Sequence, residues 1–331
     1  MPEKKVKLLT VVAIFASAMI LFLLNGSAAA GKNHQKGVGR HERDVSAKLS
    51  PKLNRLFSET DKTQSVRVVI RMKKRHSNQS DALNSEHRRK RMIRKLKREA
   101  LSDQTDVIRL LKKRRSDRMA RSLKTEFWNY VDAPQRNGKL NNYWISNSVA
   151  VTLSFEELEE LAVHPDVLEI SENIVLSIPP IEVTGEASGP VLNLWNHAAI
   201  GLDQISGLGY DGNGVRIGFI DSGIDPTHAD LAGKLTAWAE FGAGGEFIDS
   251  QPHETHPRGH GTHVASVLAG DHTGVAPGAE LLAAMALPGG NGTLEQVLAA
   301  MQWIMDPDND ADTDDGAQIV NMSWGSSGLS S

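Results

Sequence analysis

The feature that most constrains the fold of this chain is a series of almost uninterrupted apolar runs in its last third. The runs cover residues 215–220, 280–287 and 317–323. Strands that are apolar on both sides suit a parallel sheet with helices on both faces, because neither face then meets water. Helices are predicted between the runs, over 261–268 and from a Thr293 cap, with Gln296 at the capping-box position, to Met305. The alternation implies right-handed crossovers, so the sequence predicts an α/β fold with a doubly wound parallel sheet.

Two polar motifs accompany these elements. Residues 220–225 read Ile-Asp-Ser-Gly-Ile-Asp after the first apolar run, and residues 259–266 read Gly-His-Gly-Thr-His-Val-Ala-Ser at a helix start. Functional residues of open α/β sheets lie at the carboxyl ends of strands. A serine hydrolase needs a carboxylate that holds an imidazole in one tautomer. We therefore predict Asp221 as the acid and His260 as the base, in preference to a turn former and a structural histidine.

These motifs resemble the Asp and His signatures of the subtilase family, in the family's order. Residues 274–281 and the segment Ile-Val-Asn-Met-Ser-Trp-Gly at 319–325 are similar to later family blocks. The resemblance implies a subtilisin-type sheet and serine-type hydrolysis of peptide bonds. It also implies that Ser323, Trp324 and Gly325 bind polypeptide substrates and wall the S1 pocket, with residues 288–292 as the opposite edge. A substrate would then be held as an added β-strand.

The resemblance also identifies what this sequence does not contain. Family members carry an oxyanion-hole asparagine and a nucleophilic serine, in a Gly-Thr-Ser-Met-Ala type of helix start, beyond the Asn-Met-Ser block. The sequence ends at Ser331, and Ser326, Ser327, Ser330 and Ser331 have the wrong context. We expect residues 181–331 to be a truncated catalytic domain with an incomplete sheet, inactive alone. The alternative is a non-catalytic propeptide-type protease inhibitor or folding chaperone.

The first 30 residues have the three parts of a secretory signal peptide. Lys4, Lys5 and Lys7 precede an apolar run over 8–24, and Ala28-Ala29-Ala30 provides a small-residue exit. We predict cleavage after Ala30 and a secreted, extracellular or periplasmic protein without a stable membrane anchor. The alternative is an uncleaved anchor. Residues 31–64 are predicted to be a polar linker.

Residues 65–180 are predicted to form a small α+β module. Strands are expected over 65–72, 142–154 and 167–178, and a Ser154–Glu157 capping box begins a helix. The module resembles the inhibitory propeptide of secreted subtilases, which implies a ferredoxin-like fold. In the family this propeptide assists folding and blocks the cleft until it is cleaved. The basic helical stretch over 81–127 departs from the family pattern and is interpreted as an insertion.

The two modules carry opposite charge. Residues 66–126 hold 21 Lys+Arg and 7 Asp+Glu, whereas residues 212–331 hold 3 and 16. We hypothesise that this difference helps to hold the propeptide on the catalytic domain. Binding of nucleic acid is the weaker alternative, because no aromatic residues that could stack on bases lie among the basic clusters.

No cofactor is predicted to be needed for the chemistry. The chain has no cysteine, which excludes disulfides and thiolate ligands. His253, His256, His260 and His263 suggest a zinc cluster, but their spacing is not that of an H-E-x-x-H helix, so no metal site is predicted there. The acidic run over 306–315 is interpreted as a solvated loop, with a structural calcium site as the alternative. It lacks the glycine at position six and the glutamate at position twelve of an EF-hand loop.

Overall fold

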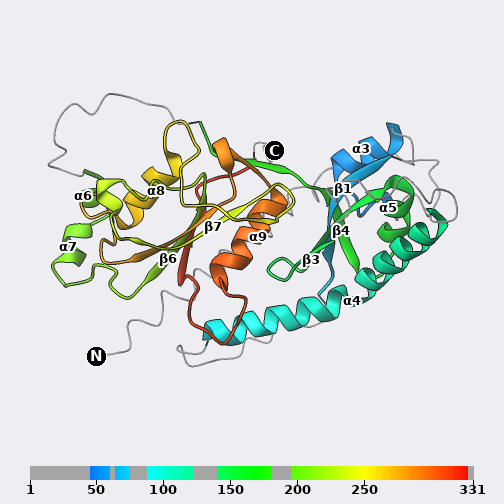
Figure 1. Cartoon of the computed structure of the whole chain (residues 1–331), viewed down its shortest axis with the longest axis horizontal. Coiled ribbons are helices and arrows are strands. Elements are labelled where there is room, and N and C mark those ends of the chain that lie inside the picture. The colour runs from blue at the N-terminus through cyan, green and yellow to red at the C-terminus, as the bar shows by residue number, and fades with distance from the viewer. Residues whose placement is uncertain (1–44, 60–63, 75–87, 123–139, 181–194, 327–331) are drawn as a thin grey trace. The chain divides into compact units, whose positions relative to one another are not determined.

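The computed structural model describes residues 45–59, 64–74, 88–122, 140–180 and 195–326 of the 331-residue chain (Figure 1). These residues form an N-terminal unit that ends at Ile174 and a C-terminal unit that begins at Val175. The predicted signal peptide lies outside the described residues. No helix within the described ranges is long and apolar enough to cross a membrane.

The N-terminal unit is built on an antiparallel sheet with the strand order β2-β3-β1-β4. Val68 and Ile70 of β1 are fully buried and share one core cluster with Val107 of α4 and Leu158 of α5. Helices α4 and α5 therefore cover the same face of the sheet. The elements of the unit are α3 (Pro51–Glu59), β1 (Ser65–Met72), α4 (Arg88–Ser122), β2 (Asn141–Tyr143), β3 (Ser148–Ser154), α5 (Phe155–Ala162) and β4 (Val167–Glu172).

The predicted capping box is confirmed at the start of α5. The backbone N–H of Glu157 donates to Ser154 Oγ, and Glu157 Oε2 accepts from the backbone N–H of Ser154 at 2.8 Å. The predicted basic helical stretch contains one continuous helix, α4. Its flanks, 81–87 and 123–127, lie outside the described residues.

The prediction of a polar linker is wrong for residues 45–59, which are folded into the N-terminal unit. Leu49 bridges to Ile170 of β4, and Leu53 of α3 is fully buried in the core of the N-terminal unit. Leu53 and Phe57 lie four residues apart and so share one face of α3. Lysines and arginines surround this short amphipathic pattern, so the composition of the segment alone indicates a polar linker.

The C-terminal unit holds the predicted parallel strands, in the sheet order β11-β6-β9-β7-β8. Strands β11, β6, β9 and β7 pair in parallel, and β8 adds antiparallel at one edge. The α/β fold with a parallel sheet is therefore confirmed. The elements are β5 (Val175–Ser177), α6 (Trp195–Ala199), α7 (Leu202–Ser206), β6 (Arg216–Asp221), η3 (Ala229–Leu231), β7 (Leu235–Phe241), β8 (Phe247–Ile248), α8 (His260–Ala269), β9 (Glu280–Met285), η4 (Pro288–Gly290), β10 (Asn291–Thr293), α9 (Leu294–Met305) and β11 (Ile319–Asn321).

Helices cover both faces of this sheet, as the apolar strands require. Ile217 and Phe219 of β6 pack in one core cluster with Ala265 of α8. The residue between them, Gly218, faces α9, since a Cβ built there would lie 2.6 Å from the side chain of Ile304. Successive residues of a strand point to opposite faces, so α8 and α9 lie on opposite sides of β6. Gly218 lets α9 approach the sheet closely.

Several elements of the C-terminal unit were not predicted. They are the strands β7 and β8, the short helices α6 and α7, and the pairing of β5 with β10. Because β5 pairs with β10, the division between the two units falls at 174/175, whereas the sequence indicated 180/181. The residues 181–194 that follow lie outside the described ranges.

Candidate active site

Asp221 is the last residue of β6, which lies between β11 and β9 in the sheet, and its side chain is fully buried. Burial raises the pKa of Asp221 above its ordinary value, although hydrogen bonds from His260 and the Ser222 N–H act in the opposite direction. The other carboxylate oxygen, Oδ2, is buried and has no hydrogen-bond partner among the described residues. The protein therefore holds a carboxylate at a position where ionisation is unfavourable.

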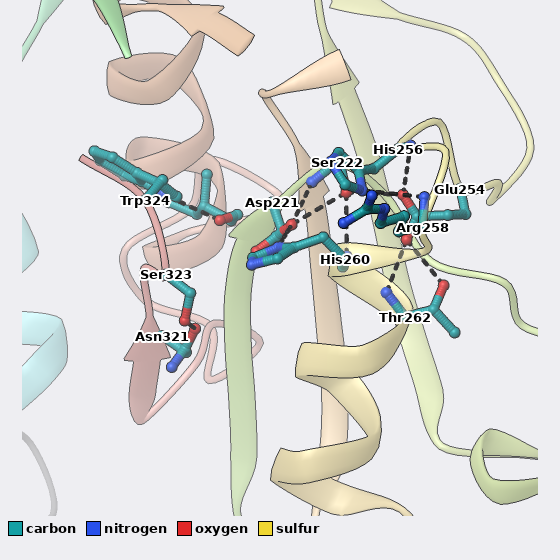
Figure 2. A network of polar contacts seen from close by, with 12 residues as sticks. Asp221, Ser222, Glu254, His256, Arg258, His260, Thr262, Asn321, Ser323 and Trp324 are labelled. Atoms are coloured by element: carbon teal, nitrogen blue, oxygen red, sulfur yellow. Dashed lines mark hydrogen bonds and ion pairs between the residues drawn. The ribbon is translucent and has the colours of Figure 1, made fainter. Parts of the chain in front are cut away.

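His260 is the first residue of α8, directly after Gly259. Gly259 has a φ of 62°, a left-handed conformation that other residues rarely adopt. The turn brings His260 Nδ1 to 2.7 Å from Asp221 Oδ1 (Figure 2). A carboxylate only accepts, so Nδ1 carries the proton and Nε2 keeps its lone pair. Within the described part of the chain, His260 Nε2 has no hydrogen-bond partner, and it is free to act as a base.

Two glycines allow the acid and base segments to approach each other. A Cβ on Gly261 would lie 2.1 Å from the carbonyl oxygen of Gly223. A Cβ on Gly223 would lie equally close, 2.1 Å, to the carbonyl oxygen of His253. Both obstacles are backbone atoms, which cannot rotate away. The Asp-Ser-Gly and His-Gly-Thr motifs therefore require glycine for packing at the site.

Glu254 is a site residue that the sequence analysis missed. It lies in the irregular segment before α8, and its carboxylate binds Ser222 and Thr262, one from each motif (Figure 2). Burial raises the pKa of Glu254, but hydrogen bonds from the His256 N–H, Ser222 Oγ and Thr262 outweigh that effect and bring it below its ordinary value. A single acidic residue in a polar loop has no periodicity, so only its position six residues before His260 could have indicated it.

The three residues predicted to bind substrate follow β11. Trp324 is buried, and its Nε1 donates to the carbonyl oxygen of Ile220 at 2.9 Å, next to Asp221. Ser323 Oγ donates to Asn321 Oδ1 at 2.8 Å. Gly325 presents its backbone to an extended segment. The indole thus fixes this edge against the strand that carries the acid.

An extended segment of the chain lies between the two predicted edges. On one side β5 pairs antiparallel with β10, and the Ile178 N–H donates to Gly290 O at 2.9 Å. On the other side Ser177 exchanges two backbone hydrogen bonds with Gly325, at 2.8 and 2.9 Å. Leu176 is fully buried, whereas Val175 is 58% exposed. The segment therefore has the form of a bound peptide strand, with alternate side chains directed inward.

His253, His256, His260 and His263, at which no metal site was predicted, do not form a group of metal-ligand atoms among the described residues. In the described ranges, one group of His, Asp and Glu side chains has ligand atoms within 4.8 Å of one another, and it consists of Asp306, Asp308 and Asp315. Hydrogen bonds from the Asp310 N–H and Thr313 lower the pKa of Asp308. Three carboxylates suit a hard cation such as Ca²⁺. This group belongs to the acidic run and lies apart in sequence from the acid and the base.

Comparisons with known proteins show what parts of the chain are similar to. Residues 212–331 match the family model of the subtilase family. The chain is therefore similar to the subtilase family over this part of its length. It is 31% identical over 211 residues to the minor extracellular protease Vpr of Bacillus subtilis (strain 168), a match that covers 58% of this chain and 25% of that protein.

A second relative extends over more of the chain. Bacillopeptidase F of the same organism is 25% identical over 85% of this chain and 21% of its own length. Among solved structures, fervidolysin from Fervidobacterium pennivorans aligns over 81% of this chain and 37% of its own, with 16% identity and a TM-score of 0.43. The chain thus spans about a quarter of the length of Vpr and about a fifth of that of bacillopeptidase F.

Proposed function

We propose that this protein is a serine-type endopeptidase in which Asp221 is the acid and His260 is the base of the catalytic triad. The observation that carries the proposal is the 2.7 Å contact between His260 Nδ1 and Asp221 Oδ1. It leaves Nε2 available to take a proton from a serine hydroxyl as that hydroxyl attacks the substrate carbonyl, and later to return it to the leaving amine. The buried carboxylate stabilises the imidazolium formed between these steps.

The proposed mechanism needs a nucleophile beyond the described residues. Ser323 belongs to the predicted substrate edge, but its hydroxyl donates to Asn321 Oδ1. We propose that the nucleophile is the serine of a Gly-Thr-Ser-Met type of segment, which residues 1–331 do not contain, and that these residues do not hydrolyse peptides without it and an oxyanion-hole donor. Oxyanion donors commonly contribute about 10²–10³-fold to kcat, so peptide hydrolysis needs the donor as well as the nucleophilic serine.

Substrates are proposed to be polypeptides bound as a strand between residues 290–293 and Gly325. Backbone hydrogen bonds would provide affinity, and pockets for alternate side chains would provide selectivity. The segment 175–178, which forms these contacts with both edges, supports this mode of binding.

A second candidate function is inhibition by the N-terminal module. The sheet order β2-β3-β1-β4 supports the ferredoxin-like interpretation of residues 65–180 as a propeptide. If so, residues 175–178 occupy the cleft as an intramolecular inhibitor until the segment after them is cleaved. We further propose export through residues 1–30, which N-terminal sequencing of the secreted protein would test by its first residue.

For cofactors, we propose that hydrolysis needs none and that any calcium is structural, at Asp306, Asp308 and Asp315. The test is chelation with EDTA well below the unfolding temperature. Peptide cleavage by a product that carries the nucleophile should continue, and its loss would contradict the proposal.

The experiment that tests the acid–base assignment is ¹⁵N NMR of the histidines. In the wild type, His260 should be the Nδ1–H tautomer, because its Nδ1 donates to Asp221. Asp221→Asn should change it to the Nε2–H tautomer, since the amide can donate to Nδ1, and His260→Ala assigns the signal. An unchanged tautomer in Asp221→Asn would contradict the assignment.

A further inference from the structure

Five hydrogen bonds converge on the carboxylate of Glu254, and the protein donates all of them. Glu254 Oε1 accepts from Ser222 Oγ at 2.7 Å and from the backbone N–H groups of Thr255 and His256 at 3.0 and 2.9 Å. Glu254 Oε2 accepts from the Thr262 N–H at 2.8 Å and from Thr262 Oγ1 at 2.9 Å. Ser222 belongs to the acid motif, Thr255 and His256 to the loop before α8, and Thr262 to α8 itself (Figure 2).

This set of donors needs a carboxylate at position 254. An ionised carboxylate offers two acceptor oxygens and no donor, whereas an amide offers one acceptor and directs N–H groups at its other partners. In a glutamine, the amide nitrogen would therefore face the donors of either Thr262 or Ser222, and the hydrogen bonds on that side would be lost. Glu254 meets the requirement at neutral pH, since its pKa lies below its ordinary value.

The network reaches the base through the first turn of α8. Gly259, the N-cap, has no side chain that could accept from the free N–H groups of this turn. Ser222 Oγ accepts from the Gly261 N–H at 3.1 Å, and Glu254 accepts from the Thr262 N–H. Gly261 and Thr262 directly follow His260. Two side chains distant in sequence therefore cap the helix that begins with the base.

The Ser222 hydroxyl connects Glu254 to the acid as well. Ser222 Oγ lies 2.7 Å from Glu254 Oε1 and 3.1 Å from Asp221 Oδ1, and it has one proton to donate. The shorter contact assigns that proton to Glu254. Asp221 Oδ1 then accepts from His260 Nδ1 and from the Ser222 N–H. The orientation of one hydroxyl thus determines how many donors share the oxygen that His260 contacts.

We propose that Glu254 is a positioning residue for the base: through the Ser222 hydroxyl and the first turn of α8, it holds the His260 imidazole against Asp221. The inference rests on the proposed function for its meaning in catalysis. In this role Glu254 contacts neither the substrate nor the reacting atoms. Its effect is on the strength and geometry of the hydrogen bond between His260 and Asp221.

The test is proton NMR of the 331-residue chain labelled with ¹⁵N-histidine. A short Nδ1–H···Oδ1 hydrogen bond places its proton far downfield, and His260→Ala identifies that signal by its loss. Glu254→Gln should shift the His260 signal upfield and broaden it. Asp225→Asn is the matched control. It also removes one carboxylate charge beside α8, but the Asp225 side chain contacts Thr227 and not this network, so the signal should stay in place.

A second variant covers the case in which Glu254→Gln does not fold. Ser222→Ala removes the connecting hydroxyl and leaves the Glu254–Thr262 contacts, and it should shift the same signal upfield. If both variants fold, Glu254→Gln should shift the signal less in the Ser222→Ala background than in the wild type, because coupled residues are not additive. An unchanged signal in a folded Glu254→Gln or Ser222→Ala protein, or equal shifts in both backgrounds, would overturn the proposal. None of these readouts needs peptide cleavage, so a failure of the proposed enzymatic function is recognised separately.

Discussion

His260 Nδ1 and Asp221 Oδ1 lie 2.7 Å apart, although 39 positions separate the two residues in the chain. The contact joins the first residue of α8 to the last residue of β6. Two glycines, one from each motif, let the two segments meet backbone to backbone. The stability of this junction, and its dependence on pH, follow from the environment of each carboxylate.

Asp221→Asn should stabilise the folded chain at neutral pH. The pKa of Asp221 is raised in the fold, chiefly by burial, so ionisation costs stability once the pH exceeds the unfolded value of about 3.9. The gain in unfolding free energy should therefore be present at pH 7 and should disappear as the pH falls below the unfolded value. Urea unfolding at both pH values measures it. A variant less stable than wild type at pH 7 would contradict this account.

Asp230→Asn should have the opposite effect. Asp230 accepts hydrogen bonds from Thr273 Oγ1 at 2.6 Å and from the His272 N–H at 2.7 Å, and its pKa lies below the ordinary value although burial acts against this. The carboxylate therefore adds stability above its unfolded pKa, and this is lost as the pH falls through the lower folded value. The expected loss at pH 7 is roughly 1–3 kcal/mol. A loss that persists unchanged in strong acid would show that charge is not its cause.

Gly261→Ala should destabilise the protein even though alanine is the better helix former. The added Cβ would lie 2.1 Å from the carbonyl oxygen of Gly223, which is backbone and cannot move aside. The expected cost is roughly 1–3 kcal/mol in chemical unfolding. Gly325→Ala is the control, because a Cβ there meets no atom within 4 Å, and it should stay within about 0.5 kcal/mol of wild type. Equal stability of the two variants would argue against the close approach at Gly261.

Leu176→Asp should release the strand that lies between the two edges. Leu176 is fully buried, and the neighbouring N–H groups of Ser177 and Ile178 donate to Gly325 O and Gly290 O. Hydrogen exchange at these two amides should be slow in the wild type and much faster in the variant. The control is Val175→Asp, since Val175 is 58% exposed and should tolerate the charge. Rapid exchange already in the wild type would refute the pairing.

Attraction between the oppositely charged modules should make their association sensitive to salt. Once the chain is cut within residues 181–190, the affinity between the two parts should weaken from about 0.05 M to about 0.5 M salt, because exposed charges are screened. The decrease should appear mainly in the association rate. An affinity that stays constant over this range would eliminate the electrostatic hypothesis.

The predictable parts of the molecule are those with strong local patterns. Apolar runs such as residues 215–220 predict buried strands, and the capping boxes at Ser154 and Thr293 predict helix starts that the structure confirms. Asp221 and His260 were predicted to act together because their motifs have a fixed order, and the structure brings their side chains into contact. Strand β7 was missed because its sequence, Leu-Thr-Ala-Trp-Ala-Glu-Phe, mixes small, polar and large residues, and its burial is set by β9 and α9.

The remaining site features depend on tertiary contacts. Glu254 acts through partners that are 1, 2, 8 and 32 residues away in sequence, and no local pattern relates them. Trp324 was expected to wall a pocket, and its hydrogen bond to Ile220 O could not be foreseen from its neighbours. Leu53 lies in a core that includes Ile170 of β4, which is more than a hundred residues further along the chain. Such features follow from the fold and not from the segment that carries them.

The central claim is best tested with a serine-directed fluorophosphonate probe and a peptide-cleavage assay. These should be applied to the 331-residue chain and to the product of a continued reading frame that includes a Gly-Thr-Ser-Met segment. The longer product should label and cleave, and His260→Ala should abolish both, while the 331-residue chain should do neither. Labelling or cleavage by the longer product that survives His260→Ala would contradict the assignment of Asp221 and His260 as the acid and base of a serine peptidase. Labelling of the 331-residue chain would contradict the proposed origin of the nucleophile.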